Sequence, residues 1–292
     1  MANRVAVFGA SGQLGTELVS LYRGRGSEIL AMTRAEVDIT DPAVVESRLA
    51  TFDPDVVINC AAYNMVDVAE KEPLAAFQVN GLAVRNIALA CRQIDAKLVH
   101  YSTDYVFDGA SSRPYREDDP THPLGAYGVS KLAGEFYARA YLDNPLVIRT
   151  SGVFGPAGMK TARGNFIETM LRLCGSGQPI RVVQDYVGAP AYAPALAART
   201  LDLLDVDASG VFHIGGGDPT TWFDFAGLIF REAGLSPELR ASSEREYRTP
   251  ARRPKYSVLS NAKMEAAGVA PMPPLVDAVR EYLALRNVAS RA

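Results

Sequence analysis

The chain has 292 residues and a formal net charge of −3, with 48% hydrophobic and 22% charged residues. This is an ordinary globular balance, and the length suits one large domain or two that share a core. A charge so close to neutral gives no reason to expect a nucleic-acid or membrane partner. Cys60, Cys91 and Cys174 show no CxxC spacing, and a strand-like run begins at Arg4 with no signal peptide before it. We therefore expect a soluble, cytoplasmic protein.

Short apolar runs alternate with longer helical patterns through the first 150 residues. Alternation of this kind predicts an α/β fold, a Rossmann-like doubly wound parallel sheet with helices on both faces. We assign residues 1–150 to this dinucleotide-binding domain, with further strand and helix contributions from about 178–213. Residues 151–292 are less regular and predict a smaller, irregular C-terminal portion that mainly binds the substrate, with the segment 236–256 the least regular part.

The predicted elements follow from these patterns and from their flanking glycines and prolines. The expected strands are Arg4–Phe8, Glu28–Met32, Asp55–Asn59, Lys97–Tyr101, Leu146–Arg149, Pro179–Val183 and Gly210–Ile214. The expected helices are Gln13–Arg25, Pro42–Thr51, Glu72–Gln93, Tyr127–Tyr141, Pro194–Leu204, Phe223–Ala233 and Pro274–Arg286.

A glycine-rich turn joins the first predicted strand to the first predicted helix. Its sequence is Gly9-Ala-Ser11-Gly12-Gln-Leu-Gly15, a GxxGxxG spacing typical of short-chain dehydrogenases. Glycines there permit a tight turn, a close backbone approach to a pyrophosphate and close packing of helix on sheet. The helix amides then favour the phosphates. A turn that binds nothing is the structural alternative, and the strand and helix on either side make it the weaker one.

The end of the second predicted strand bears on the choice of dinucleotide. An acid at this position would accept hydrogen bonds from the ribose of NAD, whereas this chain has Thr33-Arg34. A guanidinium suits a 2′-phosphate, which favours NADPH over NADH. The weaker alternatives are NADH as the cofactor and an Arg34 side chain that is merely solvated. Asp38 and Ile39 lie just beyond, where they can meet the edge and face of the adenine.

Tyr127 and Lys131 are four residues apart in a predicted helix and therefore share one face. An ammonium near a phenol lowers the pKa of the phenol, which creates a proton donor and acceptor suited to interconverting a carbonyl and an alcohol. Thr103 and Asp104 end the fourth predicted strand, at the edge where doubly wound sheets bind ligands. Thr103 can hydrogen-bond the reacting oxygen, and Asp104 can accept from a sugar hydroxyl.

Two further segments carry weaker signals. Asn59-Cys-Ala-Ala-Tyr63 puts small residues after the third strand, where a flat cofactor can lie against the backbone. The run from Arg248 to Tyr256 is basic, and Arg253 within it can clamp a diphosphate, although a solvated loop explains it equally well. The three histidines have no metal-ligand spacing, so we predict no metal site.

Taken together, these motifs resemble the dTDP-4-dehydrorhamnose reductase family of extended short-chain dehydrogenases. The resemblance covers nearly the whole chain, with Ser102-Thr-Asp-Tyr-Val-Phe107 and Tyr127-Gly-x-x-Lys-x-x-Gly-Glu135 as its most specific markers. It implies catalysis by Thr103, Tyr127 and Lys131, reduction of a keto-sugar with NADPH, and a dTDP-sugar substrate. A homodimer is a further expectation. The resemblance further implies cofactor contacts from Gly12, Gln13, Leu14, Asp38, Ile39, Ala61, Ala62, Tyr63 and Lys131, and substrate contacts from Val66, Thr103, Asp104, Tyr127, Gly152, Asn165 and Arg253.

Departures from the family pattern leave the substrate open. Gly152 stands where the family usually has a tryptophan after Arg-Thr-Ser, which removes an aromatic wall from the sugar pocket. Three hypotheses follow: a reductase of dTDP-4-dehydro-L-rhamnose, a reductase of another nucleotide keto-sugar, or a non-catalytic regulatory subunit like that of methionine adenosyltransferase. Retention of both Tyr127 and Lys131 favours an enzyme.

Overall fold

The computed structural model describes residues 3–161, 164–246 and 248–289. Its centre is one sheet of six parallel strands in the order β2-β1-β3-β4-β5-β8. The strands are apolar and mostly buried, as expected where helices cover both faces of a sheet. They are β1 (Arg4–Phe8), β2 (Glu28–Met32), β3 (Val56–Asn59), β4 (Lys97–Thr103), β5 (Leu146–Thr150) and β8 (Gly210–His213). The predicted doubly wound sheet is confirmed, with strand ends that differ from the predicted ones by a residue or two.

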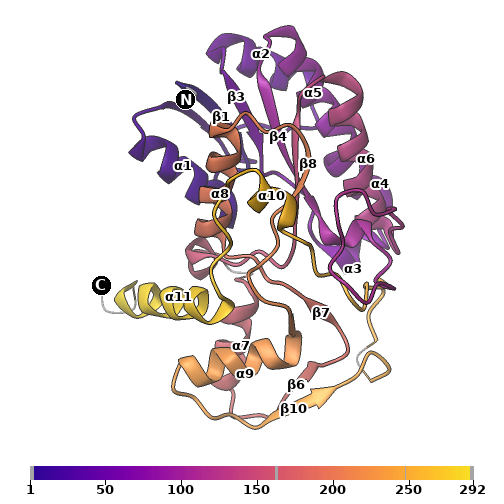
Figure 1. The fold of residues 1–292 in the computed structure, drawn as a ribbon, viewed down its shortest axis with the longest axis vertical. Helices are drawn as coiled ribbons and strands as arrows, with labels where there is room; N and C mark the ends of the chain where they lie inside the picture. The colour runs from indigo at the N-terminus through magenta and orange to yellow at the C-terminus, as the bar shows by residue number, and fades with distance from the viewer. Residues whose placement is uncertain (1–2, 162–163, 247, 290–292) are drawn as a thin grey trace.

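Two layers of helices bury the two faces of this sheet. Figure 1 shows α1 and α8 on one side and α5 and α6 on the other. Leucines of α1 and α8 share one apolar cluster with the sheet, and residues of α2, α5 and α6 form the second. The helices of the first layer are α1 (Gln13–Gly24), α8 (Ala193–Asp205) and the short α10 (Ala262–Ala266). Those of the second are α2 (Pro42–Phe52), α5 (Ala83–Gln93) and α6 (Ala126–Tyr141).

The strand order reverses direction between β1 and β3, both of which pair with each other in the middle of the sheet. In open α/β sheets, ligands bind outside the carboxyl ends of the strands at such a switch point. The glycine turn follows β1 and the segment that begins at Cys60 follows β3. The topology therefore brings both segments predicted to hold the cofactor to one crevice.

The predicted helix Glu72–Gln93 is interrupted by a π-turn. It consists of α4 (Pro73–Phe77), the π-turn η1 (Gln78–Leu82) and α5, and the short α3 (Val66–Ala69) precedes it. The run Pro73–Gln93 is long and apolar enough to cross a membrane by length and composition. Half of its most apolar window is buried, and α5 packs into the second sheet cluster, which is the behaviour of a core helix.

The C-terminal portion has its own apolar core below the sheet (Figure 1). Its helices are α7 (Phe166–Cys174), α9 (Trp222–Glu232) and α11 (Leu275–Ala289). Strand β6 (Ile180–Val183) pairs in parallel with β10 (Leu239–Ser242), and β7 (Val187–Gly188) pairs with β9 (Thr220–Thr221). Two short 3-10 turns, η2 (Asp104–Val106) and η3 (Pro156–Lys160), complete the elements.

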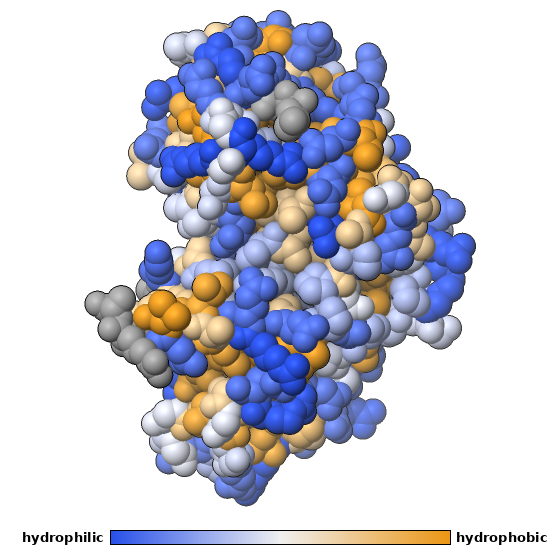
Figure 2. Space-filling view, turned by 60° about the vertical axis from the view of Figure 1, so that its left-hand side comes forward, coloured by the Kyte–Doolittle hydropathy of each residue, from blue (hydrophilic) through white to orange (hydrophobic). Residues whose placement is uncertain are grey.

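Two expectations for this half need correction. We assigned the segment 178–213 to the main sheet, but β6 pairs only with β10, and the contribution to the Rossmann layer begins at α8. The segment 236–256 was expected to be irregular, yet β10 lies within it because its residues complete the edge that β6 offers. Figure 2 shows the surface notched on its left-hand side between the upper and lower portions of the molecule.

Candidate active site

The glycine turn has the geometry of a phosphate-binding loop. The Gly9 amide donates to the Met32 carbonyl at 2.9 Å, and the backbone of Gly9 has a φ of +74°. A Cβ on Gly9 would lie 2.7 Å from the Ala61 amide nitrogen, and a Cβ on Gly15 would lie 2.3 Å from the Gly9 carbonyl oxygen. Only glycine fits at either place, because the turn runs directly against the segment after β3 and against helix α1.

The start of helix α1 is open to an anion. Gly12 is its N-cap and has no side chain with which to cap the first amides, and the first turn contains no acidic residue. Ser11 and Gly12 are exposed, and Gln13 is half-buried. Uncapped amides at the positive end of a 12-residue helix, beside a turn from which side chains are excluded, fit a dinucleotide pyrophosphate.

The predicted ribose end of the cofactor site contains an acid that the sequence pattern did not draw out. The Glu36 carboxylate accepts from both the amide and the hydroxyl of Thr33, each at 2.8 Å. These bonds lower the pKa of Glu36, which is therefore ionised at neutral pH. Arg34 is exposed. Two hydrogen bonds from Thr40 are the main reason why the pKa of Asp38 is lowered, and the charge of Arg34 lowers it further. A cation and an anion thus flank the same turn.

The segment after β3 is braced by a buried amide from the π-turn. The Tyr63 amide donates to the Asn80 carboxamide at 2.9 Å, and the Asn80 amide group donates back to the Tyr63 carbonyl at 2.9 Å. It also donates to the hydroxyl of Ser130 in helix α6 at 3.0 Å. Asn80 therefore fixes the segment from Ala61 to Tyr63 relative to helix α6. Sequence reasoning missed it, because a π-turn has no simple periodic signature.

Helix α6 presents Tyr127 in its first turn and Lys131 one turn later. The Ala126 amide at its start donates to the Glu70 carboxylate at 2.7 Å, so Glu70 caps this helix from outside it. Lys131 is 3% exposed, and its ammonium donates to the Tyr101 carbonyl at 2.5 Å. The positive charge of Lys131 is thus held in place inside the protein.

Burial lowers the pKa of Lys131 to about 8, against the opposing effect of the Glu135 carboxylate. The charged form is therefore lost as the pH rises through about 8 rather than through the usual lysine range. We expect kcat/KM to fall with increasing pH across that range, because the ammonium is needed beside Tyr127. Measurement of kcat/KM against pH tests this. A profile that stays flat well into the usual range of lysine would contradict it, and Lys131→Arg, which keeps its charge, should shift the alkaline fall upward.

Thr103 and Asp104 end β4 in a buried, polar corner. The Thr103 hydroxyl donates to the Asp104 carboxylate at 3.0 Å and accepts from the Tyr105 amide at 3.2 Å. Burial raises the pKa of Asp104 to about 6, although hydrogen bonds from Ser257 and Thr103 oppose the shift. The Tyr105 ring meets the Tyr127 ring edge-on, with centroids 5.8 Å apart. The structure thus joins the ends of β4 and α6 through adjacent rings.

A buried ion pair joins helix α6 to strand β5. Arg149 of β5 donates to both oxygens of the Glu135 carboxylate, at 2.9 and 2.8 Å, and Ser102 donates to the same carboxylate at 2.5 Å. The two charged side chains are 4% and 1% exposed. This two-point contact fixes α6 to the ends of β4 and β5. It sets the height of Tyr127 and Lys131 above the sheet.

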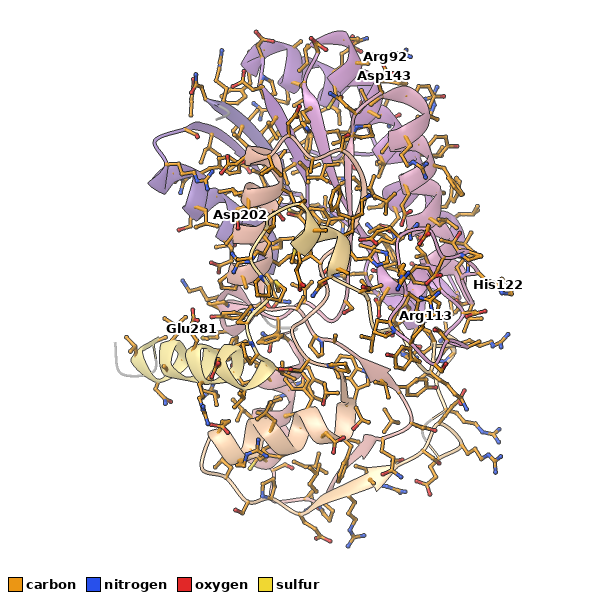
Figure 3. The ribbon with its side chains drawn as sticks, viewed as in Figure 1. Arg92, Arg113, His122, Asp143, Asp202 and Glu281 are labelled. Atoms are coloured by element: carbon orange, nitrogen blue, oxygen red, sulfur yellow. The ribbon has the colours of Figure 1, made fainter. Side chains whose placement is uncertain are left out.

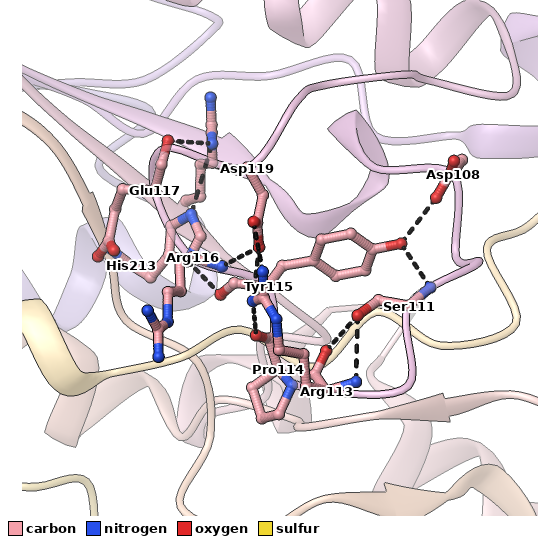
Figure 4. Close-up of polar contacts among 10 residues, drawn as sticks. Asp108, Ser111, Arg113, Pro114, Tyr115, Arg116, Glu117, Asp119 and His213 are labelled. Atoms are coloured by element: carbon pink, nitrogen blue, oxygen red, sulfur yellow. Dashed lines mark hydrogen bonds and ion pairs between the residues drawn. The ribbon is translucent and has the colours of Figure 1, made fainter.

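The long loop between β4 and α6 is held by its own polar network (Figure 4). The Tyr115 hydroxyl donates to Asp108 at 2.7 Å and accepts from the Ser111 amide at 3.1 Å. The His213 amide donates to Glu117 at 2.8 Å, and the His213 ring bonds the Tyr115 carbonyl at 3.1 Å. Burial and the nearby Arg149 charge lower the pKa of His213 to about 3. The loop that connects Thr103 to Tyr127 is therefore anchored along its length to the sheet.

Two of the three histidines, His100 and His213, are buried, and the third is exposed. His100 is buried against Asn59, and His122 lies at the outer edge of the molecule in Figure 3, with its side chain 77% exposed. Within residues 3–161, 164–246 and 248–289, no three His, Cys, Asp or Glu side chains gather into a group that could hold a metal ion.

The predicted substrate residues fall into two groups. Val66 and Tyr127 line one small pocket together with Gly125, Ala251 and Pro254. Arg253 is not among the lining residues, and its guanidinium is paired with the Asp67 carboxylate at 2.7 Å and bonded to the Ala251 carbonyl. This pair ties the segment around Arg253 to helix α3. A role for Arg253 on a diphosphate stays a prediction, and it requires Arg253 to exchange or share its partner.

Asn165 supports the site from behind. Its side-chain oxygen Oδ1 caps helix α7 by accepting from the Glu168 backbone amide. Its side-chain nitrogen Nδ2 donates to the Gln13 side chain, at 3.0 Å, and to the Tyr282 hydroxyl. Gln13 in turn accepts from the Gly155 amide at 2.9 Å. The predicted cofactor residue Gln13 and the predicted substrate residue Asn165 are thus joined directly. Asn165 uses its side chain for this link and for the cap, and substrate contact by it stays a prediction.

Comparison with known proteins now places the chain. The family model described as RmlD substrate binding domain matches residues 3–287. A dTDP-4-dehydrorhamnose reductase of Streptomyces griseus is 41% identical over 92% of this chain and 89% of its own. The chain belongs to the dTDP-4-dehydrorhamnose reductase family.

One further relative and one solved structure bear on the chemistry of this family. A dTDP-4-keto-6-deoxy-D-glucose reductase of Streptomyces niveus is 38% identical over 98% of this chain and 99% of its own. The solved dTDP-4-dehydrorhamnose reductase of Bacillus anthracis, in complex with NADP, is 33% identical with a TM-score of 0.92, covering 97% of this chain and 99% of that one. As a member of the dTDP-4-dehydrorhamnose reductase family, the protein is an NADPH-dependent oxidoreductase, as predicted, and the alternative of a non-catalytic subunit finds no support.

Proposed function

We propose that the protein reduces the 4-keto group of a dTDP-4-keto-6-deoxysugar, with dTDP-4-dehydro-L-rhamnose as the first candidate and dTDP-L-rhamnose as its product. The proposal rests on one observation: three features lie together at the carboxyl ends of the strands of the central sheet. The glycine turn after β1, Thr103 at the end of β4, and Tyr127 with Lys131 on α6 lie where parallel strands of this sheet end. NADPH, when bound, supplies the hydride.

The chain's own residues would perform the proton transfer and hold the substrate. Tyr127 would give its phenolic proton to the oxygen of the keto group, since a tyrosine beside a lysine is an effective acid near neutral pH. Lys131, charged below a pH of about 8, would stabilise the phenolate that remains. Thr103 would donate to the same oxygen, and Asp104 would accept from a neighbouring sugar hydroxyl. A homodimer and a cytoplasmic location remain predictions.

A second candidate keeps the reaction and changes the sugar. Gly152 is exposed in place of a large aromatic side chain, and one relative is named for dTDP-4-keto-6-deoxy-D-glucose. We would test both by following NADPH oxidation with a panel of dTDP-keto-sugars. Turnover of dTDP-4-dehydro-L-rhamnose above the others supports the first candidate, and preference for a different sugar supports the second. If the pure protein binds NADPH but oxidises it with none of them, the proposed function is wrong.

Cofactor preference gives a separate prediction. Arg34→Ala should raise the KM for NADPH by about 10-fold or more and leave that for NADH nearly unchanged, because a charge-assisted bond to a phosphate is lost. Glu36, ionised on the same turn, should oppose the 2′-phosphate, so Glu36→Gln should shift preference toward NADPH. Arg92→Ala, on the outer end of α5 (Figure 3), is the matched control. Equal losses for both cofactors in Arg34→Ala would reject a contact with the 2′-phosphate.

A further inference from the structure

Trp222 lies beside the space that a side chain on Gly152 would occupy. A Cβ on Gly152 would be 3.4 Å from Cη2 of Trp222 and 3.3 Å from Cα of Pro190. Gly152 itself is exposed, with a φ of +50°, a conformation that any larger residue adopts only under strain. A side chain at residue 152 would therefore need a different backbone, and the nearest large ring is supplied instead by helix α9.

The position of Gly152 puts this indole close to the end of β4, where Thr103 lies. Gly152 is two residues beyond Thr150, the last residue of β5, and Thr150 is the register partner of Thr103 in β4. Neighbouring strands are about 4.8 Å apart. Thr103, the predicted catalytic threonine, is therefore one strand spacing away from Thr150, and the edge of Trp222 lies beside Gly152, two residues after Thr150.

A second path of contacts leads to the same indole from the opposite side. Ser257 hydrogen-bonds the Asp104 carboxylate, and the Ser257 amide donates to the Val187 carbonyl at 2.8 Å. Val187 of β7 pairs with Thr221 of β9, the residue directly before Trp222. The two paths close a ring of contacts around the corner that holds Thr103 and Asp104, and Trp222 is a member of that ring.

The indole is fixed rather than loosely exposed. Its ring lies 4.8 Å from the Phe166 ring and 6.2 Å from the Phe225 ring, and those two phenyl rings stack on each other at 5.1 Å. Thr221 caps helix α9 by accepting from the Asp224 amide at 3.0 Å, which fixes where the helix begins. Trp222 is only half-buried by these contacts. A large aromatic surface is therefore held in place with part of it uncovered.

We propose that Trp222 forms the aromatic wall of the sugar subsite, and that Gly152 leaves the space through which the sugar reaches it. This deepens the proposed function and rests on it. The C–H face of a pyranose packs on an indole through apolar contact and through attraction to the negative face of the ring. A wall supplied from α9 meets the sugar from a different direction than one supplied at residue 152. Trp222 is a specificity-determining residue, which contacts the sugar and moves no proton.

The fluorescence of the protein offers a direct test, because Trp222 is the only tryptophan of the chain. The protein would be titrated with dTDP-L-rhamnose and with dTDP, while calorimetry on the same samples records binding. We expect the sugar nucleotide to change tryptophan emission well beyond the change that dTDP causes. Binding of dTDP-L-rhamnose with no emission change beyond that of dTDP would overturn the role of Trp222 and leave the reductase standing. Failure of both nucleotides to bind would overturn the proposed function, and the inference with it.

Substitution provides the second measurement. Trp222→Ala should raise the KM for the keto-sugar nucleotide about 10-fold, equivalent to about 1.4 kcal/mol, with the KM for NADPH unchanged. Trp222→Phe should recover part of the loss. Phe136→Ala, at an exposed aromatic residue on the outer face of α6, is the control and should change neither constant. An unchanged sugar KM in Trp222→Ala with a wild-type melting temperature would overturn the proposal, as would equal losses for sugar and NADPH. If Trp222→Ala fails to fold, the emission titration decides.

Discussion

Tyr127→Phe is expected to lower kcat by about two to four orders of magnitude while the affinity for NADPH stays nearly the same. The substitution removes one hydroxyl and keeps the ring, so the edge-on contact with Tyr105 is retained. Only the proton donor is lost, and it is needed chiefly in the transition state. Single-turnover rates of NADPH oxidation and the Kd for NADPH are the two measurements.

A control on the same helix separates chemistry from folding. Tyr137 lies on α6, ten residues after Tyr127 along the helix, and stacks on Tyr141 away from the reacting groups. Tyr137→Phe should keep full activity. Full activity in Tyr127→Phe would show that another group gives the proton. Loss of NADPH affinity together with kcat would mean instead that the helix had moved.

Glu135→Ala is expected to destabilise the protein by about 3–5 kcal/mol, because it leaves the Arg149 guanidinium buried without its partner. Both hydrogen bonds of Arg149 to the carboxylate and that of Ser102 are lost together. Since this contact holds α6 to the sheet, the variant should also lose activity at temperatures where it remains folded. Denaturant unfolding and the melting temperature measure the first effect, and kcat measures the second.

Two controls give this prediction its meaning. The double variant Glu135→Leu with Arg149→Met removes both charges and should recover most of the stability, because neither member of the ion pair is left buried without the other. Arg181→Ala breaks an exposed pair with Glu246 and should change stability by about 1 kcal/mol or less. If Glu135→Ala were as mild as Arg181→Ala, the buried pair would not hold the catalytic helix in place.

The parts of the site predicted from sequence are those set by neighbours in the chain. The glycine turn depends on spacing within seven residues, and Tyr127 with Lys131 depends on one helical turn. Both were found because a strand, a turn and a helix succeed one another locally. The doubly wound parallel sheet was predicted from the same alternation of strands and helices.

The parts that escaped prediction come from contacts between distant segments. The bonds of Asn80 to Tyr63 and Ser130, and the bond of Ser257 to Asp104, join residues whose pairing no local pattern reveals. Helix α7 was missed because it is a nine-residue helix between two glycine-rich segments, Gly155-Pro-Ala-Gly158 and Gly175-Ser-Gly177. The pair of Arg253 with Asp67 likewise depends on how the C-terminal portion folds back over α3.

The last strand of the sheet has a consequence for how the protein is made. Strand β8 completes the sheet beside β5, and α8 covers the apolar face of α1, so the layer begun at Arg4 is closed only by residues near 213. In a nascent chain that has passed residue 150, Leu14 and Leu18 still lack the part of their apolar cluster that α8 supplies. The ribosome therefore releases the chain as far as α8 before the first helix finds its partner. The cofactor cleft is in this sense a late product of synthesis, although its signature turn is among the first residues to emerge.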